Sequence, residues 1–166
     1  GVNNGAVPSA RGYSFDGVND YIGSQDGPVT LSTNDWTASG WVKLNVVGNS
    51  AIALISAGSY SANSNWLDIL DMKVSIWLQQ GSEKRWVQGN TVLSINEWHH
   101  FCYTYQKQGK YDIFVNGIKD ANTVTTTDEL DSMIFNKIGV HEPPGRWLNG
   151  NIADVRIYNR ALSPEE

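Results

Sequence analysis

The chain has 166 residues, a net charge of −5 and one cysteine, and 17% of its residues are charged. This length predicts one domain with a core that needs no disulfides, and a single cysteine excludes an intrachain disulfide. The acidic charge, the lack of a basic run and the lack of a long apolar stretch argue against nucleic acid, anionic membranes and membrane insertion. Because the sequence begins at Gly1 without a methionine, we expect residues 1–166 to be a single domain of a longer, multidomain protein.

Short runs of alternating apolar and polar residues, separated by Gly, Asn, Asp and Ser, predict strands over almost the whole chain. This pattern predicts an all-β fold, a two-sheet antiparallel sandwich. A helix is expected only at the end, with Ser163 as N-cap and Pro164 as the first helical residue, followed by Glu165 and Glu166. The predicted strands, in chain order, are 13–15, 21–22, 36–43, 51–56, 66–71, 74–80, 85–87, 91–93, 98–105, 111–115, 135–138 and 152–158.

Three tryptophans occur among aspartates and glutamines in the stretch 66–88, and strand register decides whether they share a face. With turns at 72–73 and 81–84, Trp66 lies opposite Gln79 in the first hairpin. Met-Lys is not a favoured dipeptide for a tight turn, but a different loop keeps the faces if it keeps the parity of the side chains. One face is then apolar, with Leu67, Ile69, Val74, Ile76 and Leu78. The other face holds Trp66, Asp68, Ser75, Trp77, Gln79, Trp86 and Gln88.

A face of Trp, Asp, Gln and Ser suits a carbohydrate. Sugar rings stack their C–H patches on aromatic faces, while carboxylates and amides hydrogen-bond their hydroxyls. Three alternatives stay open at this point. A loop or another domain covers the tryptophans, or they are scattered surface aromatics, or the face binds a protein partner and exposes a contiguous hydrophobic patch.

Five short blocks cover nearly the whole chain: YSFDGVNDYI (13–22), WTASGWVKL (36–44), NEWHHFCYTY (96–105), YDIFVNG (111–117) and NGNIADVRIYNRALSPEE (149–166). In this order they resemble the laminin-G-like, or pentraxin-like, modules of the concanavalin A-like jelly-roll superfamily. The resemblance implies a jelly roll, a fold that also hosts enzymes. Such modules are often appended to polysaccharide-degrading enzymes, adhesins and viral surface proteins, which implies an extracellular or cell-surface location.

The resemblance also sorts the other aromatic residues. It implies that Trp36, Trp41 and Trp98 belong to the core, as does Leu148, and that Trp147 points away from the core. The tryptophans in segments that vary within the family are the ones expected to select a ligand. The expected carbohydrate site is therefore Trp66, Asp68, Trp77, Gln79, Trp86, Gln88 and Trp147, with Arg146 and His141 at its rim.

Catalysis is disfavoured by the placement of the acidic residues. Related jelly-roll glycoside hydrolases carry several carboxylates on alternate residues of one strand, and a glycosidase needs two. Here Asp68 is alone on its face, because Asp71 has the opposite parity. His99 and His100 are adjacent, so they point to opposite faces and do not make a metal pair, and His100 is expected in the core. The expected function is a non-catalytic binding module, with a divergent lyase or hydrolase as the lesser alternative.

A structural calcium ion is a candidate cofactor. Asp16 and Asp20 flank a glycine-containing turn, and Asp154 is in the last strand, which runs beside the first in this fold. Carboxylates and turn carbonyls make a hard-oxygen site that suits Ca²⁺. Ala153 replaces an acidic residue that many relatives carry, which weakens the case. The alternative is that Asp16 and Asp20 cap the turn by hydrogen bonds to its backbone.

Overall fold

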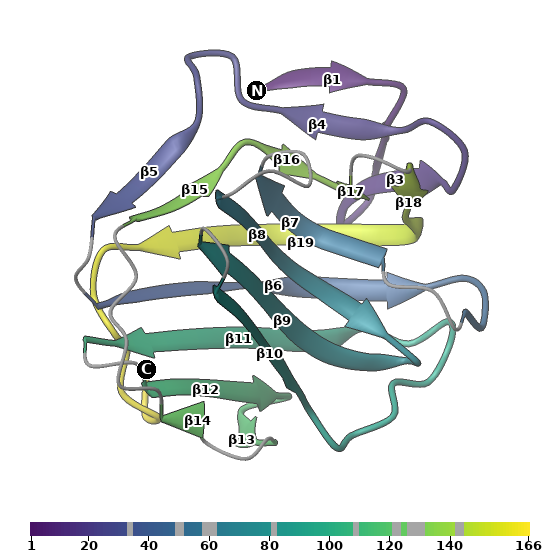
Figure 1. Cartoon of the computed structure of the whole chain (residues 1–166). Coiled ribbons are helices and arrows are strands. Elements are labelled where there is room, and N and C mark those ends of the chain that lie inside the picture. Colours follow the sequence, from purple (N-terminus) through teal and green to yellow (C-terminus); the bar gives the residue numbers. More distant parts are fainter. Residues whose placement is uncertain are drawn as a thin grey trace.

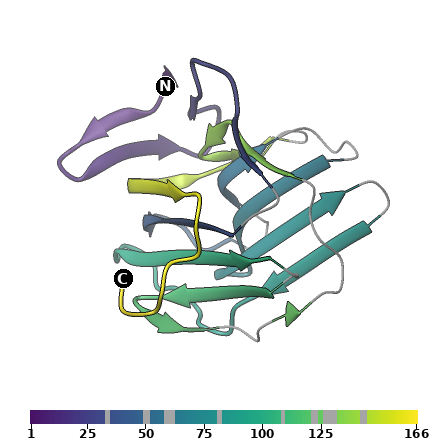
Figure 2. The same cartoon turned by 90° about the vertical axis from the view of Figure 1, so that its left-hand side faces the viewer.

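The regular elements of the described part of the chain are all strands, and most of them form two large antiparallel sheets that face each other (Figures 1 and 2). A computed structural model describes residues 1–32, 35–48, 52–57, 63–80, 83–107, 110–120, 124–125, 132–141 and 145–166. The predicted all-β sandwich is thus confirmed. The first and last long strands lie side by side, as the resemblance to a jelly roll implies, since β19 pairs with both β3 and β6.

The 7-stranded sheet, called here the tryptophan sheet, has the order β1 (Val2–Asn4), β4 (Tyr21–Gly23), β16 (Lys137–Ile138), β7 (Ile52–Ala57), β8 (Asn63–Leu70), β9 (Lys73–Gln80), β10 (Glu83–Gln88). The 8-stranded sheet has the order β13 (Ile118–Lys119), β12 (Lys110–Val115), β11 (His99–Gln106), β6 (Trp36–Leu44), β19 (Asn149–Tyr158), β3 (Gly12–Asp16), β2 (Val7–Ser9), and β14 (Val124–Thr125) pairs with β12. Two small two-stranded sheets pair β5 (Val29–Ser32) with β15 (Ser132–Phe135), and β17 (Val140–His141) with β18 (Arg146–Trp147).

The core lies between the two sheets and is built from alternate residues of the long strands. On the 8-stranded sheet, Phe101, Tyr103 and Tyr105 of β11 point inward and are almost fully buried. On the tryptophan sheet, the inward residues are the apolar ones that strand parity predicts, including Leu67 and Ile76. The remaining buried side chains of this cluster include Trp36, Leu44, Leu78 and Leu148.

The register of the first hairpin differs from the prediction by two residues. Leu70 pairs with Lys73, so the two-residue turn is Asp71-Met72, with φ angles of 51° and 62°. Two consecutive residues with positive φ are typical of the type I′ turn that matches the twist of a hairpin. The turn lies one residue earlier than expected, which shifts every cross-strand partner by two and leaves the parity intact.

The second hairpin shows the same shift. Gln80 pairs with Glu83, whereas the prediction placed Gln80 opposite residue 85; turn residues 81 and 82 lie outside the described residues. Trp77 therefore has Trp66 as its direct partner on one side and Trp86 on the other. The two predicted faces survive, and the three tryptophans are closer to one another than expected.

Several expected elements are wrong. Residues 91–93 are not a strand, although Leu93 is buried and its amide donates to the Met72 carbonyl at 2.8 Å. The expected strand 135–138 is divided at Asn136 between β15 and β16, which belong to different sheets. The expected helix after Ser163 is a turn, closed by the Glu166 amide on the Ser163 carbonyl at 3.2 Å. Residue 51, the predicted start of a strand, lies outside the described residues.

Candidate functional site

Trp66, Trp77 and Trp86 form one row across β8, β9 and β10, on the side of the tryptophan sheet that faces away from the core. The indoles of Trp66 and Trp77 are stacked, with centroids 5.9 Å apart and planes inclined by 22°. Direct partners on adjacent strands have Cβ atoms about 5 Å apart, which is the spacing that lets neighbouring rings touch. We call these three residues the tryptophan row.

Exposure rises along the row from one end to the other. Trp66 is 3% exposed, Trp77 is partly exposed, and Trp86 is 49% exposed. Trp86 is open because β10 is the last strand of its sheet. Trp66 is thus neither part of the core between the sheets nor available for direct contact with a ligand.

A second hairpin covers the buried end of the row. The His141 imidazole lies edge-on to the Trp66 indole, with centroids 3.9 Å apart and an angle of 73°. The hairpin of β17 and β18 packs on β7, and the Ser56 hydroxyl fixes it by donating to the Val140 carbonyl at 2.6 Å. Ser56 is the direct cross-strand partner of Trp66, so the anchor and the covered ring are neighbours.

A polar row runs beside the tryptophan row, because Asp68, Ser75 and Gln88 are in register two residues further along each strand. The Ser75 hydroxyl donates to Oδ1 of Asp68, and Gln88 Nε2 donates to the Leu70 carbonyl at 2.8 Å. Burial raises the pKa of Asp68 to about 7, against the lowering effects of the Ser75 hydrogen bond and of the Arg146 charge. Asp68 is only 5% exposed, so its carboxylate is closed to direct contact with a ligand.

His141 and Arg146 face the site together, because they are direct partners in the β17–β18 hairpin. Burial, together with the positive charge of Arg146, lowers the pKa of His141 to about 4, so the imidazole is neutral at pH 7. Trp147 has the opposite parity and packs on Tyr21, with centroids 6.2 Å apart. The structure therefore brings His141 and Arg146 to the tryptophan row and places Trp147 on the other side of their hairpin.

The three carboxylates expected to hold calcium do not converge. Asp16 Oδ1 accepts the Val18 amide at 2.7 Å, and Asp20 Oδ2 accepts the Asp16 amide at 2.9 Å, as the turn-capping alternative describes. Asp154 lies at a bulge of β19 and pairs with Arg156 at 2.9 Å. No group of three potential metal-binding side chains occurs among the described residues, and calcium binding stays a prediction.

The outer face of the 8-stranded sheet holds aromatic residues that the resemblance placed in the core. Trp41 is 41% exposed and contacts the ring of His100 at 5.2 Å, and the Lys43 ammonium lies 5.9 Å from the ring of Trp98. The expectation that Trp41 and Trp98 are core residues is wrong, and so is the core position of His100. The cause is parity, since Trp41 alternates with the buried Val42 on β6 and His100 alternates with the buried Phe101 on β11.

One catalytic expectation, that Asp68 is alone on its face, can be compared with the geometry. Asp71 is exposed in the turn and is not paired with a residue of the polar row, so within the described residues Asp68 is the one carboxylate in that row. The sequence did not single out His141 as the cover of Trp66, and no local pattern at position 141 carries that information.

Among the described residues, no helix has the length and apolar composition needed to span a membrane.

Solved structures share this fold. Domain 4 of AbnA, a GH43 extracellular arabinanase from Geobacillus stearothermophilus solved with arabinotriose, matches with a TM-score of 0.72 and 18% identity, over 99% of this chain and 79% of that chain. A putative carbohydrate binding protein from Bacteroides ovatus matches with a TM-score of 0.68 and 19% identity, over 95% of this chain and 46% of that chain. A SAP-like pentraxin from Limulus polyphemus matches with a TM-score of 0.63 and 15% identity, over 95% and 81% of the two chains.

At these identities the structures establish the fold alone. No curated protein matches the chain significantly. The sequence model Laminin_G_3, described as the concanavalin A-like lectin/glucanases superfamily, matches residues 16–166, which is most of the chain. Because this match covers most of the chain and the fold is a two-sheet sandwich, the chain belongs to the concanavalin A-like lectin/glucanases superfamily.

Proposed function

We propose that this chain is a non-catalytic carbohydrate-binding module that stacks a sugar ring on Trp86, with Trp77 beside it. The observation that carries the proposal is the tryptophan row, in which a buried ring supports a partly exposed ring and then a ring with 49% of its surface open. A fixed, exposed aromatic face loses little entropy on binding and matches the C–H patches of a sugar.

The polar neighbours of the two rings suit the same ligand. Gln79 lies beside Trp77 on β9, and Gln88 lies beside Trp86 on β10, each half-buried on the same face. Lys84, opposite Gln79, is exposed at the border of the surface. Amide groups donate and accept hydrogen bonds at once, which sugar hydroxyls also do. Trp66 and Asp68, both buried, hold the surface in place and do not contact the sugar.

The expected affinity is modest. Stacking contributes about 1 kcal/mol per ring beyond the burial of area, by analogy with aromatic pairs. With two rings and a few hydrogen bonds, we expect a Kd between about 1 μM and about 1 mM, or roughly −8 to −4 kcal/mol.

The comparisons support the proposal without deciding the ligand. AbnA domain 4 was solved with arabinotriose, and the Bacteroides ovatus protein is called a putative carbohydrate binding protein. The absence of catalysis is part of the proposal, and it rests on Asp68 being buried without a second carboxylate in the described polar row. A polysaccharide partner, a multidomain parent and an extracellular location belong to the same proposal.

The test is a titration of intrinsic tryptophan fluorescence with a panel of soluble polysaccharides, which includes arabinan, xylan, β-glucan and galactan. We expect a saturable change with at least one polysaccharide, and its loss in Trp86→Ala. The matched control is Tyr13→Ala, because Tyr13 is an aromatic residue of similar exposure, 39%, on β3 of the other sheet. The proposal is wrong if every polysaccharide leaves the spectrum unchanged, or if both variants respond as the original chain does.

A further inference from the structure

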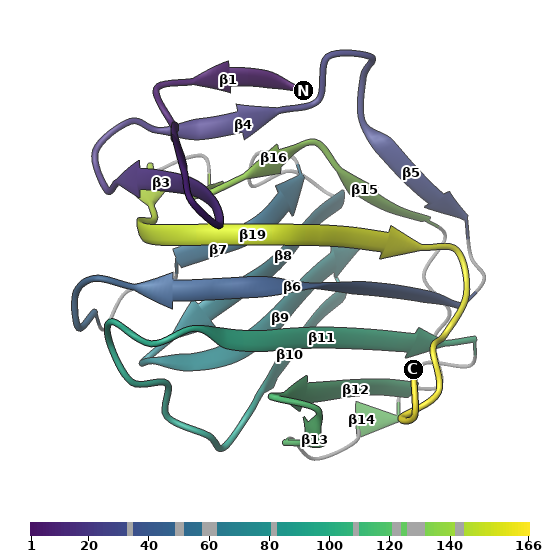
Figure 3. The same ribbon diagram turned by 180° about the vertical axis from the view of Figure 1, so that it is seen from behind.

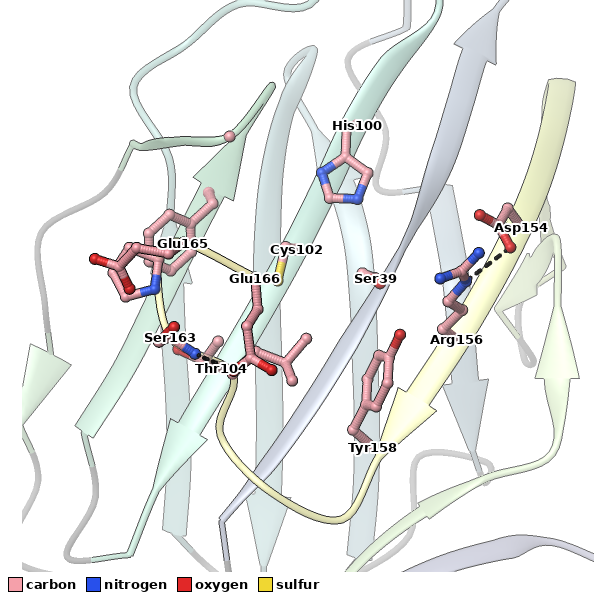
Figure 4. A pocket seen from close by; sticks show the side chains of 14 residues that line it. Ser39, His100, Cys102, Thr104, Asp154, Arg156, Tyr158, Ser163, Glu165 and Glu166 are labelled. Carbon is pink, nitrogen blue, oxygen red and sulfur yellow. Dashed lines mark hydrogen bonds and ion pairs between the residues drawn. The ribbon is translucent and has the colours of Figure 1, made fainter.

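A cavity of about 300 Å³ lies on the outer face of the 8-stranded sheet, the face remote from the tryptophan row. Its floor is formed by β6, β11 and β19, and the segment that follows β19 lies over it (Figures 3 and 4). Thr37 fixes this segment, because its hydroxyl donates to the Arg160 carbonyl and accepts from the Leu162 amide, both at 2.9 Å. Ligand pockets begin at about this volume, which suits a ligand of one ring.

The floor of the cavity presents polar groups that are buried but open to the cavity. Ser39 of β6 and Thr104 of β11 are 7% and 5% exposed, and both line the cavity. In the described structure neither hydroxyl has a protein partner. Cys102, the direct partner of Ser39, lies between them (Figure 4). Buried hydroxyls normally have hydrogen-bond partners, so these two favour a ligand that can supply them.

The walls of the cavity combine the aromatic rings of Tyr158 and Phe114 with the neutral imidazole of His100. The His100 ring lines the cavity (Figure 4). The Trp41 ring packs edge-on against it, with ring centroids 5.2 Å apart. Burial lowers the pKa of His100, which leaves its ring uncharged at neutral pH, with one donor and one acceptor. Tyr158 and Phe114 give the cavity aromatic surface.

The charged groups at the cavity compensate one another. Arg156 is paired with Asp154 at 2.9 Å, and Arg160 is paired with Glu166 through two hydrogen bonds at 2.8 and 2.6 Å. Glu165 adds one exposed carboxylate at the rim. A phosphate or carboxylate would find its possible guanidinium partners already paired and a carboxylate nearby, so an anion is disfavoured.

We propose that this cavity is a second binding site, which takes one neutral sugar ring and acts independently of the Trp86 surface. The hydroxyls of the sugar both donate and accept hydrogen bonds, so they can bond to Ser39, Thr104 and the neutral His100. The C–H face of the sugar ring lies against Tyr158. The module then binds carbohydrate on both of its sheets. This site does not depend on the function proposed for the tryptophan row, because the two share no residue.

Cys102 makes the test specific, since it lines this cavity and is the single cysteine of the chain. We would measure its rate of modification by methyl methanethiosulfonate in the Trp86→Ala variant, at about pH 9 because burial raises the pKa of the thiol to about 11. The probes are galactose, glucose, mannose and arabinose, with sorbitol and inorganic phosphate as controls. A sugar at about ten times its Kd should slow the reaction about tenfold.

Variants of the floor separate binding from a general effect on folding. Ser39→Ala and Thr104→Val remove the hydroxyls with little change in volume, and we expect them to weaken the protection while the Tm stays close to that of the original chain. Ser9→Ala, on the edge strand β2 of the same sheet, should leave the protection unchanged. The proposal is overturned if no sugar protects Cys102 in the Trp86→Ala variant, or if sorbitol or phosphate protects it equally.

Discussion

The imidazole of His141 covers the indole of Trp66, with ring centroids 3.9 Å apart, and both side chains are almost completely buried. Trp86, at the other end of the tryptophan row, is 49% exposed. The three tryptophans of one sheet face therefore have different roles. The inner ring stabilises the fold, the outer ring is available to a ligand, and Trp77 connects the two.

The ends of the row are expected to respond differently to truncation. Trp66→Ala removes a buried ring and leaves a cavity, so we expect a loss of about 3–5 kcal/mol in the free energy of unfolding. Trp86→Ala removes an exposed ring and should change the same quantity by about 1 kcal/mol or less. Urea unfolding followed by far-UV circular dichroism measures both. Equal losses for the two variants would contradict the exposure gradient.

Asp68 and His141 are expected to make opposite contributions to the pH dependence of stability. The pKa of Asp68 is raised in the folded state from 3.8 to about 7, so between these values the unfolded state has lost a proton that the folded state keeps. Stability contributed by Asp68 therefore falls as the pH rises through this window. The pKa of His141 is lowered from 6.5 to about 4, so its contribution falls as the pH drops from 6.5 to 4.

These two dependences oppose each other between about pH 4 and pH 6.5, each with a slope of at most about 1.4 kcal/mol per pH unit. In Asp68→Asn the free energy of unfolding should rise with pH across this window more steeply than in the original chain. In His141→Gln it should instead fall with pH. Urea unfolding at pH 4.5, 5.5 and 6.5 gives the slopes, and identical slopes in all three proteins would exclude the opposition of these two residues.

The turn at Asp71-Met72 offers a test of the register. Asp71 is exposed and has a φ of 51°, a conformation that asparagine adopts readily and a β-branched residue does not. We expect Asp71→Asn to stabilise the chain by about 0.5 kcal/mol, and Asp71→Val to destabilise it by about 1–2 kcal/mol. The midpoint of urea unfolding measures both changes. A neutral Asp71→Val would mean that the turn lies elsewhere, as in the register with residues 72–73 at its centre.

The calcium prediction is tested at the first turn. Asp20 accepts the Asp16 amide, so Asp20→Ala should cost about 1–2 kcal/mol in EDTA, where metal plays no part. The calcium prediction expects, in addition, a higher Tm of the original chain in millimolar Ca²⁺ than in EDTA, and the loss of that difference in Asp16→Asn. Mg²⁺ is the control cation. An unchanged Tm in Ca²⁺ would leave turn capping as the role of both carboxylates.

The sequence allowed the two faces of stretch 66–88 to be predicted, although the partners were wrong by two residues. Parity explains this result, because a turn displaced by one residue moves partners by an even number and leaves each side chain on its face. Strand parity does not predict how exposed each tryptophan is. Whether Trp66 is open depends on His141, 75 positions later, which reaches it through a hairpin fixed by Ser56.

The predicted core residues are likewise correct in part. Trp36 and Leu148 are core residues, as the resemblance implied, whereas Trp41 is on the outer face. Tryptophan occurs on both the buried and the partly exposed face of a strand, so the residue type alone does not predict which face it is on. The position of Trp41 in the strand predicts its side: Val42 and Leu44 are buried on the core side of β6, so Trp41, which has the opposite parity, lies on the outer side.

The strand that carries Trp86 is also the free edge of its sheet, and a free edge is a template on which a second copy can add a strand. Glu83 and Lys84 begin this strand, and Lys84 is exposed on the same face as Trp86. Adding a strand there would strip water from the Lys84 ammonium of each copy. The charge of Lys84 therefore protects β10 against edge-to-edge aggregation, and engineering of the surface for tighter binding has to retain it.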